Sequence, residues 1–311
     1  MRRQGKVWPV GAGPGDVGLF TIKGKDILAK AEVVVYDSLV GDGVLTMVPE
    51  DAEKINVGKR AGHHTMKQEN INKVLLEKAQ EGKRVVRLKG GDPFLFGRGG
   101  EELELLCEHK IPYEVVPGVT SCIAVPAYNG IPVTHRDFCS SVHVITGHTL
   151  KGAQSEEELA SYGACEGTLV FLMGLNNLNT ISAGLIKGGK PADTPTAVIE
   201  DGSLNSQRVI RGTLKTIYEQ TVKAEIKTPA IIVVGETAAF DLLPDKTQDQ
   251  AIKTDTKPLT GLTIGITGTA SFTNRLETAL KAQGAKTIPG MEMEVIAEKT
   301  LKETALTCLL K

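Results

Sequence analysis

The stretch Arg87-Leu-Lys-Gly-Gly-Asp-Pro-Phe-Leu-Phe-Gly-Arg-Gly-Gly-Glu-Glu102 decides the fold class. It follows an apolar run typical of a buried strand and leads into a run with the apolar spacing of a helix. A glycine-rich turn at the carboxyl end of a buried strand lets a ligand approach bare backbone, because glycine has no Cβ. Asp92 adds a negative charge at this turn, which suits a cationic or hydroxyl-rich ligand better than a phosphate.

On both sides of this stretch, short apolar runs alternate with helix-like runs, which predicts a mostly parallel α/β sheet. Residues 150–165 are polar and acidic, so a loop or an exposed helix is expected there. The predicted strands are 6–11, 32–37, 84–88, 113–116, 142–146, 168–173, 196–200, 230–234 and 262–267, with one more from Lys286. The predicted helices are 21–31, 68–81, 98–109, 120–128, 177–186, 214–222 and 273–283.

Turn signals divide the chain into four parts. Pro117-Gly118 marks a boundary between two α/β domains, 1–117 and 118–243. The polar, proline-flanked stretch 244–260 is typical of a linker. The remainder, 261–311, is about one βαβ unit and is expected to be a partial domain.

The composition is that of a soluble globular enzyme. The 311 residues include 41% hydrophobic and 23% charged residues, and the formal net charge is −1. No global field therefore favours nucleic acid or an anionic membrane. The five cysteines form no Cys-x-x-Cys pair, so we expect reduced thiols in the cytoplasm and no metal site. No apolar run reaches the roughly 18 residues of a membrane span, and no signal peptide is expected.

Two segments have the spacing of nucleotide-binding motifs. Gly13-Pro-Gly-Asp-Val-Gly18 fits the dinucleotide pattern G-x-G-x-x-G, and Asp37 follows at a suitable distance. Asp16, however, would repel the pyrophosphate. The segment 184–191 has the spacing of a phosphate-binding P-loop, but Pro191 stands where a hydroxyl residue should ligate magnesium. This segment is expected to end a helix instead.

The ordered motifs resemble the uroporphyrinogen-III C-methyltransferase family over about residues 6–240. Pro9, in the first strand, and Cys122 depart from the usual pattern, and Pro9 is expected to disturb that strand. The tail after residue 261 weakly resembles the start of uroporphyrinogen-III synthase. The motifs are Val10-Gly-Ala-Gly-Pro-Gly-Asp16, Val35-Tyr-Asp-Ser-Leu-Val40, Gly58-Lys-Arg60, Arg87 to Glu102, Val116 to Arg136, Leu172-Met-Gly174 and Thr228-Pro-Ala230.

The resemblance implies a two-domain α/β tetrapyrrole methylase fold with the active site in the interdomain cleft. It implies S-adenosylmethionine as co-substrate and no metal. The substrate would be uroporphyrinogen III, methylated twice to precorrin-2 on the way to sirohaem and cobalamin. A cytoplasmic homodimer without nucleic-acid or membrane partners is expected.

The resemblance also implies which residues form the site, from their positions in the matching motifs. The catalytic base and acid would be Asp37 and Lys59, although a loop cap and a solvated surface charge are the simpler alternatives. Met173 considered alone would be a core residue. Cofactor contacts would be Pro14, Gly90, Gly91, Asp92, Leu95, Thr120, Ser121, Met173, Gly202 and Ala230. The substrate carboxylates would meet cationic side chains among Lys59, Arg60, Arg87, Arg98 and Arg136, with Arg98 favoured.

Three alternatives remain open from the sequence. The chain could methylate a later corrin intermediate or, as a sister family does, 16S RNA. It could be a dinucleotide-dependent oxidoreductase. It could also be a non-catalytic ligand-binding protein whose tail recruits a synthase.

Overall fold

The computed structural model describes residues 4–58, 66–149, 152–243, 263–268, 270–283 and 285–292. The chain divides into two compact units, and the first ends at Leu243. Two large sheets and the short two-stranded sheet β6-β7 lie in the described part of the first unit, and the large sheets are described in turn.

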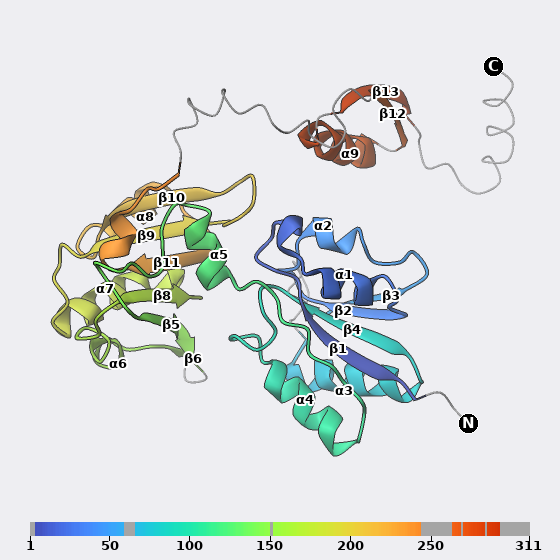
Figure 1. Cartoon of the computed structure of the whole chain (residues 1–311), viewed down its shortest axis with the longest axis horizontal. Coiled ribbons are helices and arrows are strands. Elements are labelled where there is room, and N and C mark those ends of the chain that lie inside the picture. The colour runs from blue at the N-terminus through green and yellow to red at the C-terminus, as the bar shows by residue number, and fades with distance from the viewer. Residues whose placement is uncertain are drawn as a thin grey trace, which may run out of the picture. The chain divides into compact units, whose positions relative to one another are not determined.

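The first sheet is fully parallel, with the strand order β1-β4-β2-β3 (Figure 1). Three of its strands match the predicted ranges to within one residue, but β3 was not predicted. Its sequence is Glu-Lys-Ile-Asn, and an edge strand that is half exposed carries a weak apolar signal. The strands are β1 (Lys6–Gly11), β2 (Val33–Tyr36), β3 (Glu53–Asn56) and β4 (Arg84–Lys89). Because they are parallel, their carboxyl ends share one edge of the sheet.

Helices cover both faces of this sheet. Val86 and Leu88 of β4 join one buried cluster and Val85 joins the other, because successive strand residues point to opposite faces. This two-sided burial explains the near-continuous apolar runs of the sequence. α1 (Ile22–Leu28) and α2 (Asp42–Leu45) pack on one face, and α3 (Gln68–Gln80) and α4 (Gly99–Glu108) pack on the other (Figure 1).

The strand predicted over 113–116 is not continuous. This segment forms two isolated parallel bridges to β1 in place of a ladder. The backbone N–H groups of Val7 and Gly11 donate to the carbonyl groups of Pro112 and Val116. In a parallel pair, every second residue of a strand donates its N–H to the same neighbouring strand, so residue 9 should donate between Val7 and Gly11. Pro9 has no N–H and cannot make this hydrogen bond. Pro9 therefore interrupts this edge of the sheet, while the register between β1 and β4 is unbroken.

The second sheet is mixed, with the order β10-β9-β11-β8-β5 (Figure 1). Only the pair β5–β8 is parallel, so the expectation of a mostly parallel sheet is wrong for this half of the first unit. β10 was not predicted. It is joined to β9 by residues 201–207, and so short a connection makes two strands antiparallel neighbours. The strands are β5 (Val142–Thr146), β8 (Thr168–Leu172), β9 (Pro195–Glu200), β10 (Arg208–Thr213) and β11 (Ala230–Val234).

Helices also cover both faces of the second sheet. α5 (Ser121–Ala127) and the 3-10 helix η3 (Glu236–Ala239) pack on one face. α6 (Glu156–Ala160), α7 (Leu178–Lys187) and α8 (Ile217–Lys223) pack on the other. α7 ends within the segment that has P-loop spacing, which confirms that this segment closes a helix. The short elements are η1 (Val17–Leu19), η2 (Leu175–Asn177), β6 (His148–Thr149) and β7 (Gly152–Ala153).

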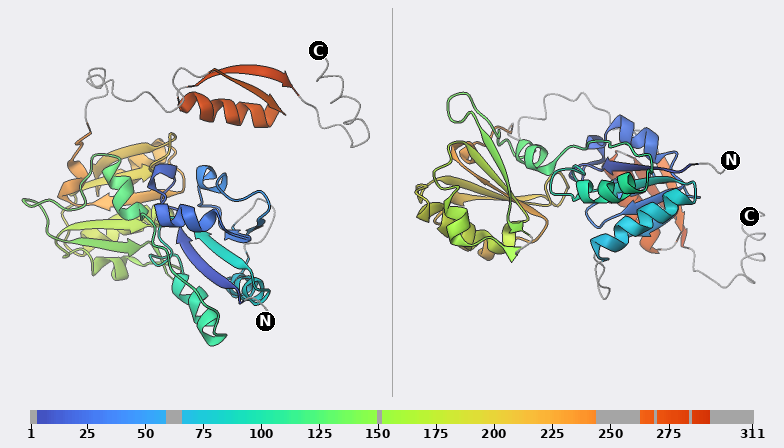
Figure 2. Two further views of the ribbon diagram at one scale, coloured as in Figure 1. Left: turned by 45° about the vertical axis from the view of Figure 1, so that its right-hand side comes forward. Right: turned by 90° about the horizontal axis from the view of Figure 1, so that it is seen from below.

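The second unit contains one βαβ motif, in the order that the sequence predicted. β12 (Thr263–Gly268) pairs in parallel with β13 (Lys286–Glu292), and α9 (Ala270–Ala282) lies along them (Figure 2). The predicted linker 244–260 lies outside the described residues. The domain boundary at residues 117 and 118 and the likeness of the tail to a synthase remain predictions.

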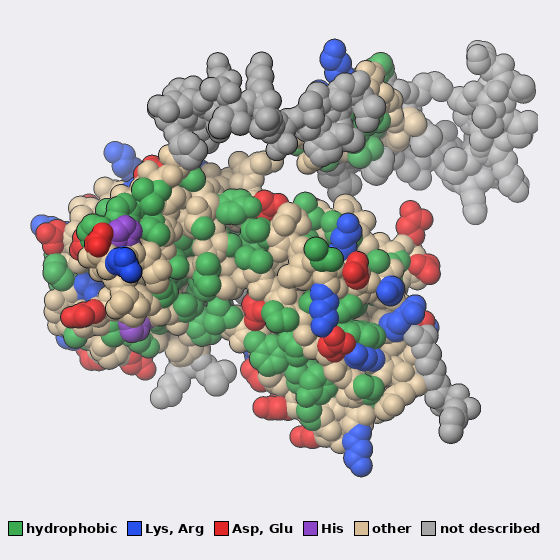
Figure 3. All heavy atoms as spheres, in the orientation of Figure 1, with side chains coloured by type: hydrophobic (Ala, Val, Ile, Leu, Met, Phe, Trp, Pro, Cys, Tyr) green, Lys and Arg blue, Asp and Glu red, His purple; other side chains and the backbone are tan. Residues whose placement is uncertain are grey.

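Charges of both signs are interspersed on the face shown in Figure 3. The four cysteines in the described ranges (Cys107, Cys122, Cys139 and Cys165) are free thiols. Within those ranges, no three His, Cys, Asp or Glu side chains come together as a metal site requires. No helix that the structure describes is both long and apolar enough to span a bilayer.

Candidate functional site

The three glycine-rich loops meet at one point. Gly13 and Gly91 exchange two backbone hydrogen bonds, of 2.7 and 3.2 Å. A Cβ on Gly118 would lie 2.3 Å from the carbonyl oxygen of Gly91 and 2.6 Å from the Cα of Gly11. Such distances are too short for a side chain, so only glycine allows these backbones to touch. We call this contact of Gly11, Gly13, Gly91 and Gly118 the glycine corner.

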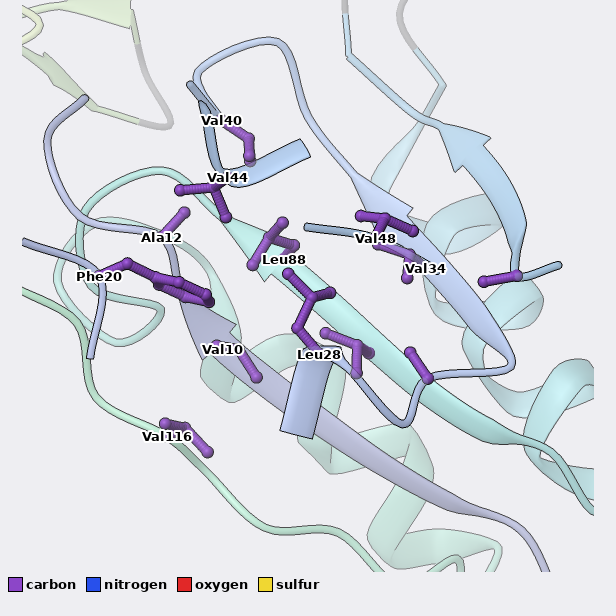
Figure 4. Packing of buried hydrophobic residues seen from close by; sticks show 13 residues of the cluster. Val10, Ala12, Phe20, Leu28, Val34, Val40, Val44, Val48, Leu88 and Val116 are labelled. Carbon is purple, nitrogen blue, oxygen red and sulfur yellow. The ribbon is translucent and has the colours of Figure 1, made fainter. Parts of the chain in front are cut away.

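An apolar cluster supports the glycine corner from one face of the first sheet (Figure 4). Ala12 and Leu88, which precede two of the loops, are buried. Val40 and Val44 pack in the same cluster from the segment that follows β2. The loops therefore rest on a close-packed core, which holds their backbone in place.

Asp92 ties two of the loops together. Its Oδ2 accepts the backbone N–H of Gly118 at 3.0 Å, and its Oδ1 accepts that of Phe94 at 2.8 Å. A carboxylate oxygen has two acceptor positions, so each oxygen keeps one for a ligand. The negative charge expected from the sequence is therefore fixed beside the glycine corner.

Three predicted cofactor residues share one edge of the second sheet. Met173 follows β8, Gly202 follows β9 closely, and Ala230 begins β11, which is antiparallel to both strands. Met173 is 55% exposed, so the alternative that it packs in the core is wrong. Its backbone has a φ of 56°, a left-handed conformation that is uncommon for residues other than glycine.

α5 connects the glycine corner with this edge. Thr120 and Ser121 begin the helix shortly after Gly118 of the corner. A Cβ on Gly202 would lie 2.2 Å from Val125 of α5, so the loop after β9 packs directly on the helix. Leu95 belongs to the loop after β4, and it packs against the buried apolar cluster that contains Val125 of α5. Segments from both sheets therefore converge around α5.

Asp16 occupies a helix N-terminus that a dinucleotide would need. It is the N-cap of η1, and its Oδ1 accepts the N–H of Gly18 at 2.7 Å. The next helix, α1, is capped in the same way by Thr21. A pyrophosphate binds free N–H groups at a helix N-terminus. Here the protein's own side chains occupy both positions, which disfavours the dinucleotide alternative.

Asp37, the predicted base, lies directly after β2. Its Oδ1 accepts the N–H of Leu39 at 3.0 Å, and its Oδ2 lies 3.6 Å from Nη2 of Arg87. The side chain is still 26% exposed. Asp37 is therefore a loop cap and also a water-accessible carboxylate. The predicted residues Lys59 and Arg60 lie outside the described residues.

Arg87 does not lie at the rim where the sequence analysis placed it. Its side chain is 3% exposed and points from β4 toward α4, where Nε donates to Oε1 of Glu102 at 3.0 Å. Nζ of Lys89 donates to the same oxygen at 2.8 Å, and Glu102 is fully buried. We call Arg87, Lys89 and Glu102 the buried charge cluster. Their positions in β4 and α4, facing each other beneath the glycine turn, explain the burial.

In the buried charge cluster, two cationic side chains pair with one carboxylate, so the positive charge is only partly balanced. Burial, and secondly the charge of Arg87, lowers the pKa of Lys89. Gln68 adds a third donor to Oε1 of Glu102 at 3.2 Å, whereas Oε2 has no hydrogen-bond partner among the described residues. Sequence reasoning missed this cluster. The available signal was the pair of charged residues, 87 and 89, within an otherwise apolar strand.

The two remaining cationic candidates are exposed. Arg98 caps α4 with a φ of 57° and pairs with Glu101 through bonds of 2.9 and 2.5 Å. This pair raises the pKa of Arg98 and lowers that of Glu101. Arg136 lies in an exposed turn between His135 and Cys139. An anionic substrate would therefore compete with Glu101 for Arg98.

Comparison with known sequences gives consistent matches. The profile of the Tetrapyrrole (Corrin/Porphyrin) Methylases matches residues 6–218. The chain is 47% identical over 287 residues to the porphyrin biosynthesis protein HemD of Ruminiclostridium josui, covering 92% of this chain and 56% of that protein. It is 51% identical over 240 residues to the siroheme synthase of Escherichia fergusonii, covering 77% and 52%. The chain thus spans about half the length of these relatives.

One of the similar solved structures is a methyltransferase. It is the uroporphyrin-III C-methyltransferase of Thermus thermophilus complexed with S-adenyl homocysteine. The TM-score is 0.65 at 39% sequence identity, and the match covers 75% of this chain and 98% of that one. The two-domain α/β fold expected from the sequence is confirmed.

Proposed function

The chain belongs to the tetrapyrrole (corrin/porphyrin) methylases, and on this basis we propose that it methylates uroporphyrinogen III twice, from S-adenosylmethionine, to give precorrin-2. One observation carries the proposal: the glycine corner brings three bare backbone loops together beside the fixed carboxylate of Asp92. The likeness to a methyltransferase that was solved with S-adenyl homocysteine supports it. Precorrin-2 leads to both sirohaem and cobalamin.

The residues at the two sheet edges fit this cofactor. Bound there, S-adenosylmethionine supplies a methyl group on a sulfonium cation. Asp92 would contribute a negative charge and free acceptor positions, and Thr120 and Ser121 would contribute hydroxyl groups. The exposed thioether of Met173 offers polarizable surface. Backbone contacts would come from the remaining predicted residues, Pro14, Gly90, Gly91, Gly202 and Ala230, with apolar contact from Leu95.

We propose that Asp37 accepts the proton that the methylated ring loses. Its carboxylate follows β2 at the same sheet edge as the glycine corner, with Arg87 beside it at 3.6 Å. Lys59 would donate a proton or hold a substrate carboxylate. Holding both reactants in line would supply much of the acceleration. The eight carboxylates of the substrate would be met by Arg60, Arg98 and Arg136, because guanidinium groups match carboxylates.

An anaerobic assay with uroporphyrinogen III and labelled S-adenosylmethionine tests the reaction. We expect two labelled methyl groups per ring. Calorimetry of the same preparation should show binding of S-adenosylhomocysteine and no binding of NAD. Transfer to a precorrin but not to uroporphyrinogen III would favour the alternative of a later methyltransferase. Binding of NAD alone would indicate an oxidoreductase, and cofactor binding without turnover would indicate a scaffold protein.

Replacing Arg98 with alanine should weaken substrate binding more than cofactor binding. We expect the KM for uroporphyrinogen III to rise about 3- to 10-fold, since an exposed charged contact is modest and Arg98 already has a partner in Glu101. The Kd for S-adenosylhomocysteine should stay unchanged, which serves as the internal control. An unchanged KM in a folded variant would remove Arg98 from the substrate site.

We also propose that the enzyme is a cytoplasmic homodimer that requires no metal. The resemblance to the family supports the dimer, and the free cysteines in the described ranges are compatible with a reducing compartment. Sedimentation analysis should give twice the chain mass of 33.2 kDa. Activity should survive dialysis against a chelator, and its loss under those conditions would contradict the metal-free proposal.

A further inference from the structure

Asp16 joins the loop after β1 to the part of the chain that carries the second sheet. The hydroxyl of Tyr128, at the end of α5, donates to its Oδ2 at 2.7 Å. The backbone N–H of Asp16 donates to Oγ of Ser203, in the loop after β9, at 3.1 Å. We call Asp16, Tyr128 and Ser203 the latch. It connects three segments that lie far apart in the sequence.

Further hydrogen bonds close the latch into a ring. The N–H of Ser203 donates to Oε1 of Gln207 at 2.8 Å, and Nε2 of Gln207 donates to Oδ1 of Asn129 at 3.1 Å. Asn129, the neighbour of Tyr128, is buried and donates to the carbonyl of Val125 at 2.9 Å. The ring thus returns to α5, so the loop after β9 and the end of α5 hold Asp16 between them.

Each segment of the latch also carries residues assigned above to the cofactor. Pro14 lies two positions before Asp16, and Gly202 immediately precedes Ser203. Ser121 begins α5, about 10 Å from its end at a rise of 1.5 Å per residue. A Cβ on Gly15 would lie 2.8 Å from the side chain of Leu204, so the loops after β1 and β9 are in close contact.

We propose that Asp16 and Tyr128 are positioning residues that hold these three segments in the arrangement that binds the cofactor. This inference rests on the proposed function. Its physical basis is preorganisation, because loops that are already ordered lose less entropy when a ligand binds. The hydrogen bond to Asp16 raises the pKa of Tyr128 to about 12, because the carboxylate stabilises the phenol that donates to it.

The variant Tyr128→Phe removes one hydroxyl group and tests the proposal. We expect the Kd for S-adenosylhomocysteine and the KM for S-adenosylmethionine to rise together, about 3- to 10-fold, as for the loss of one ordinary hydrogen bond. The kcat at saturating cofactor should be unchanged. Tyr218→Phe is the matched control, because Tyr218 is 41% exposed against 38% for Tyr128 and lies on α8. Equal losses in both variants would overturn the proposal.

A double-mutant cycle tests whether Asp16 and Tyr128 act together or independently. Asp16→Asn keeps an N-cap for η1 through its side-chain oxygen, but an amide N–H₂ group, which cannot accept, replaces the oxygen that accepts the hydroxyl of Tyr128. The variant with both changes should bind S-adenosylhomocysteine no more weakly than the poorer single variant. Additive losses would show that Asp16 and Tyr128 act separately and would overturn the proposal.

Hydrogen exchange on the ligand-free enzyme tests the latch without the cofactor. The amides of residues 202–204 should exchange faster in Tyr128→Phe than in the wild type and in Tyr218→Phe. Unchanged exchange would overturn the latch itself. If the wild type failed to bind S-adenosylhomocysteine, the proposed function and this inference would both fall. Normal wild-type binding with unchanged binding by Tyr128→Phe would overturn this inference alone.

Discussion

Replacing Glu102 with alanine is expected to lower the free energy of unfolding by about 3–5 kcal/mol, as breaking a buried ion pair does. Glu102 is fully buried and accepts hydrogen bonds from both Arg87 and Lys89, which are 3% and 4% exposed. Without the carboxylate, two positive groups would remain side by side away from water. Burial already lowers the pKa of Lys89, so the variant should release its proton more readily still.

Chemical denaturation measures this loss, with Glu104→Ala as the matched control. Glu104 lies on the same helix but is exposed, so its replacement should change stability by less than about 0.5 kcal/mol. Glu102→Gln should fall between the two, because the amide keeps a hydrogen-bond acceptor while losing the charge. A stability of Glu102→Ala equal to that of Glu104→Ala would contradict the assignment of a buried charge cluster.

Replacing Gly118 with alanine is expected to disrupt the proposed cofactor site. The added Cβ would lie 2.3 Å from the carbonyl oxygen of Gly91 and 2.6 Å from the Cα of Gly11. Both obstacles are backbone, which cannot rotate away as a side chain can. We expect a loss of about 1–3 kcal/mol in stability through overpacking. Affinity for S-adenosylhomocysteine should fall about 10- to 100-fold, as the same energy range implies.

Gly100→Ala is the control for this change. Gly100 lies in α4, and a Cβ there would meet no atom within 4 Å. Alanine is the better helix former by roughly 0.5–1 kcal/mol, so this variant should be as stable as the wild type or more so. Isothermal titration calorimetry and thermal denaturation of both variants check the prediction. Tight cofactor binding by Gly118→Ala would show that the glycine corner is not part of the site.

The elements predicted correctly are those with strong local signals. β1, β2 and β4 are mostly apolar runs, because helices bury both faces of the first sheet. β3 and β10 were missed, since exposed edge strands lack such a run. The prediction of a continuous strand at 113–116 was wrong for a different reason. Pro9, a residue about a hundred positions away, removes the donor that would have completed it.

For the site, the sequence located the loops but not the partners of the charged side chains. Asp92 was expected to face a ligand, and the structure shows that it also binds the backbone of Gly118. Arg87 was expected at the rim and is buried against Glu102. Asp16 was interpreted as a charge that repels phosphate, whereas it caps η1 and accepts the hydroxyl of Tyr128.

The sequence by itself therefore determined the family, the α/β class and the positions of the glycine turns. These follow from properties of neighbouring residues, namely apolar runs and the absence of a Cβ. Only the tertiary structure decided which loops touch and which charges are paired. Asp16 and Tyr128 are 112 positions apart, and no local pattern encodes their contact. Such pairings arise when loops and helices from distant parts of the chain pack together, because packing brings distant side chains within hydrogen-bonding distance.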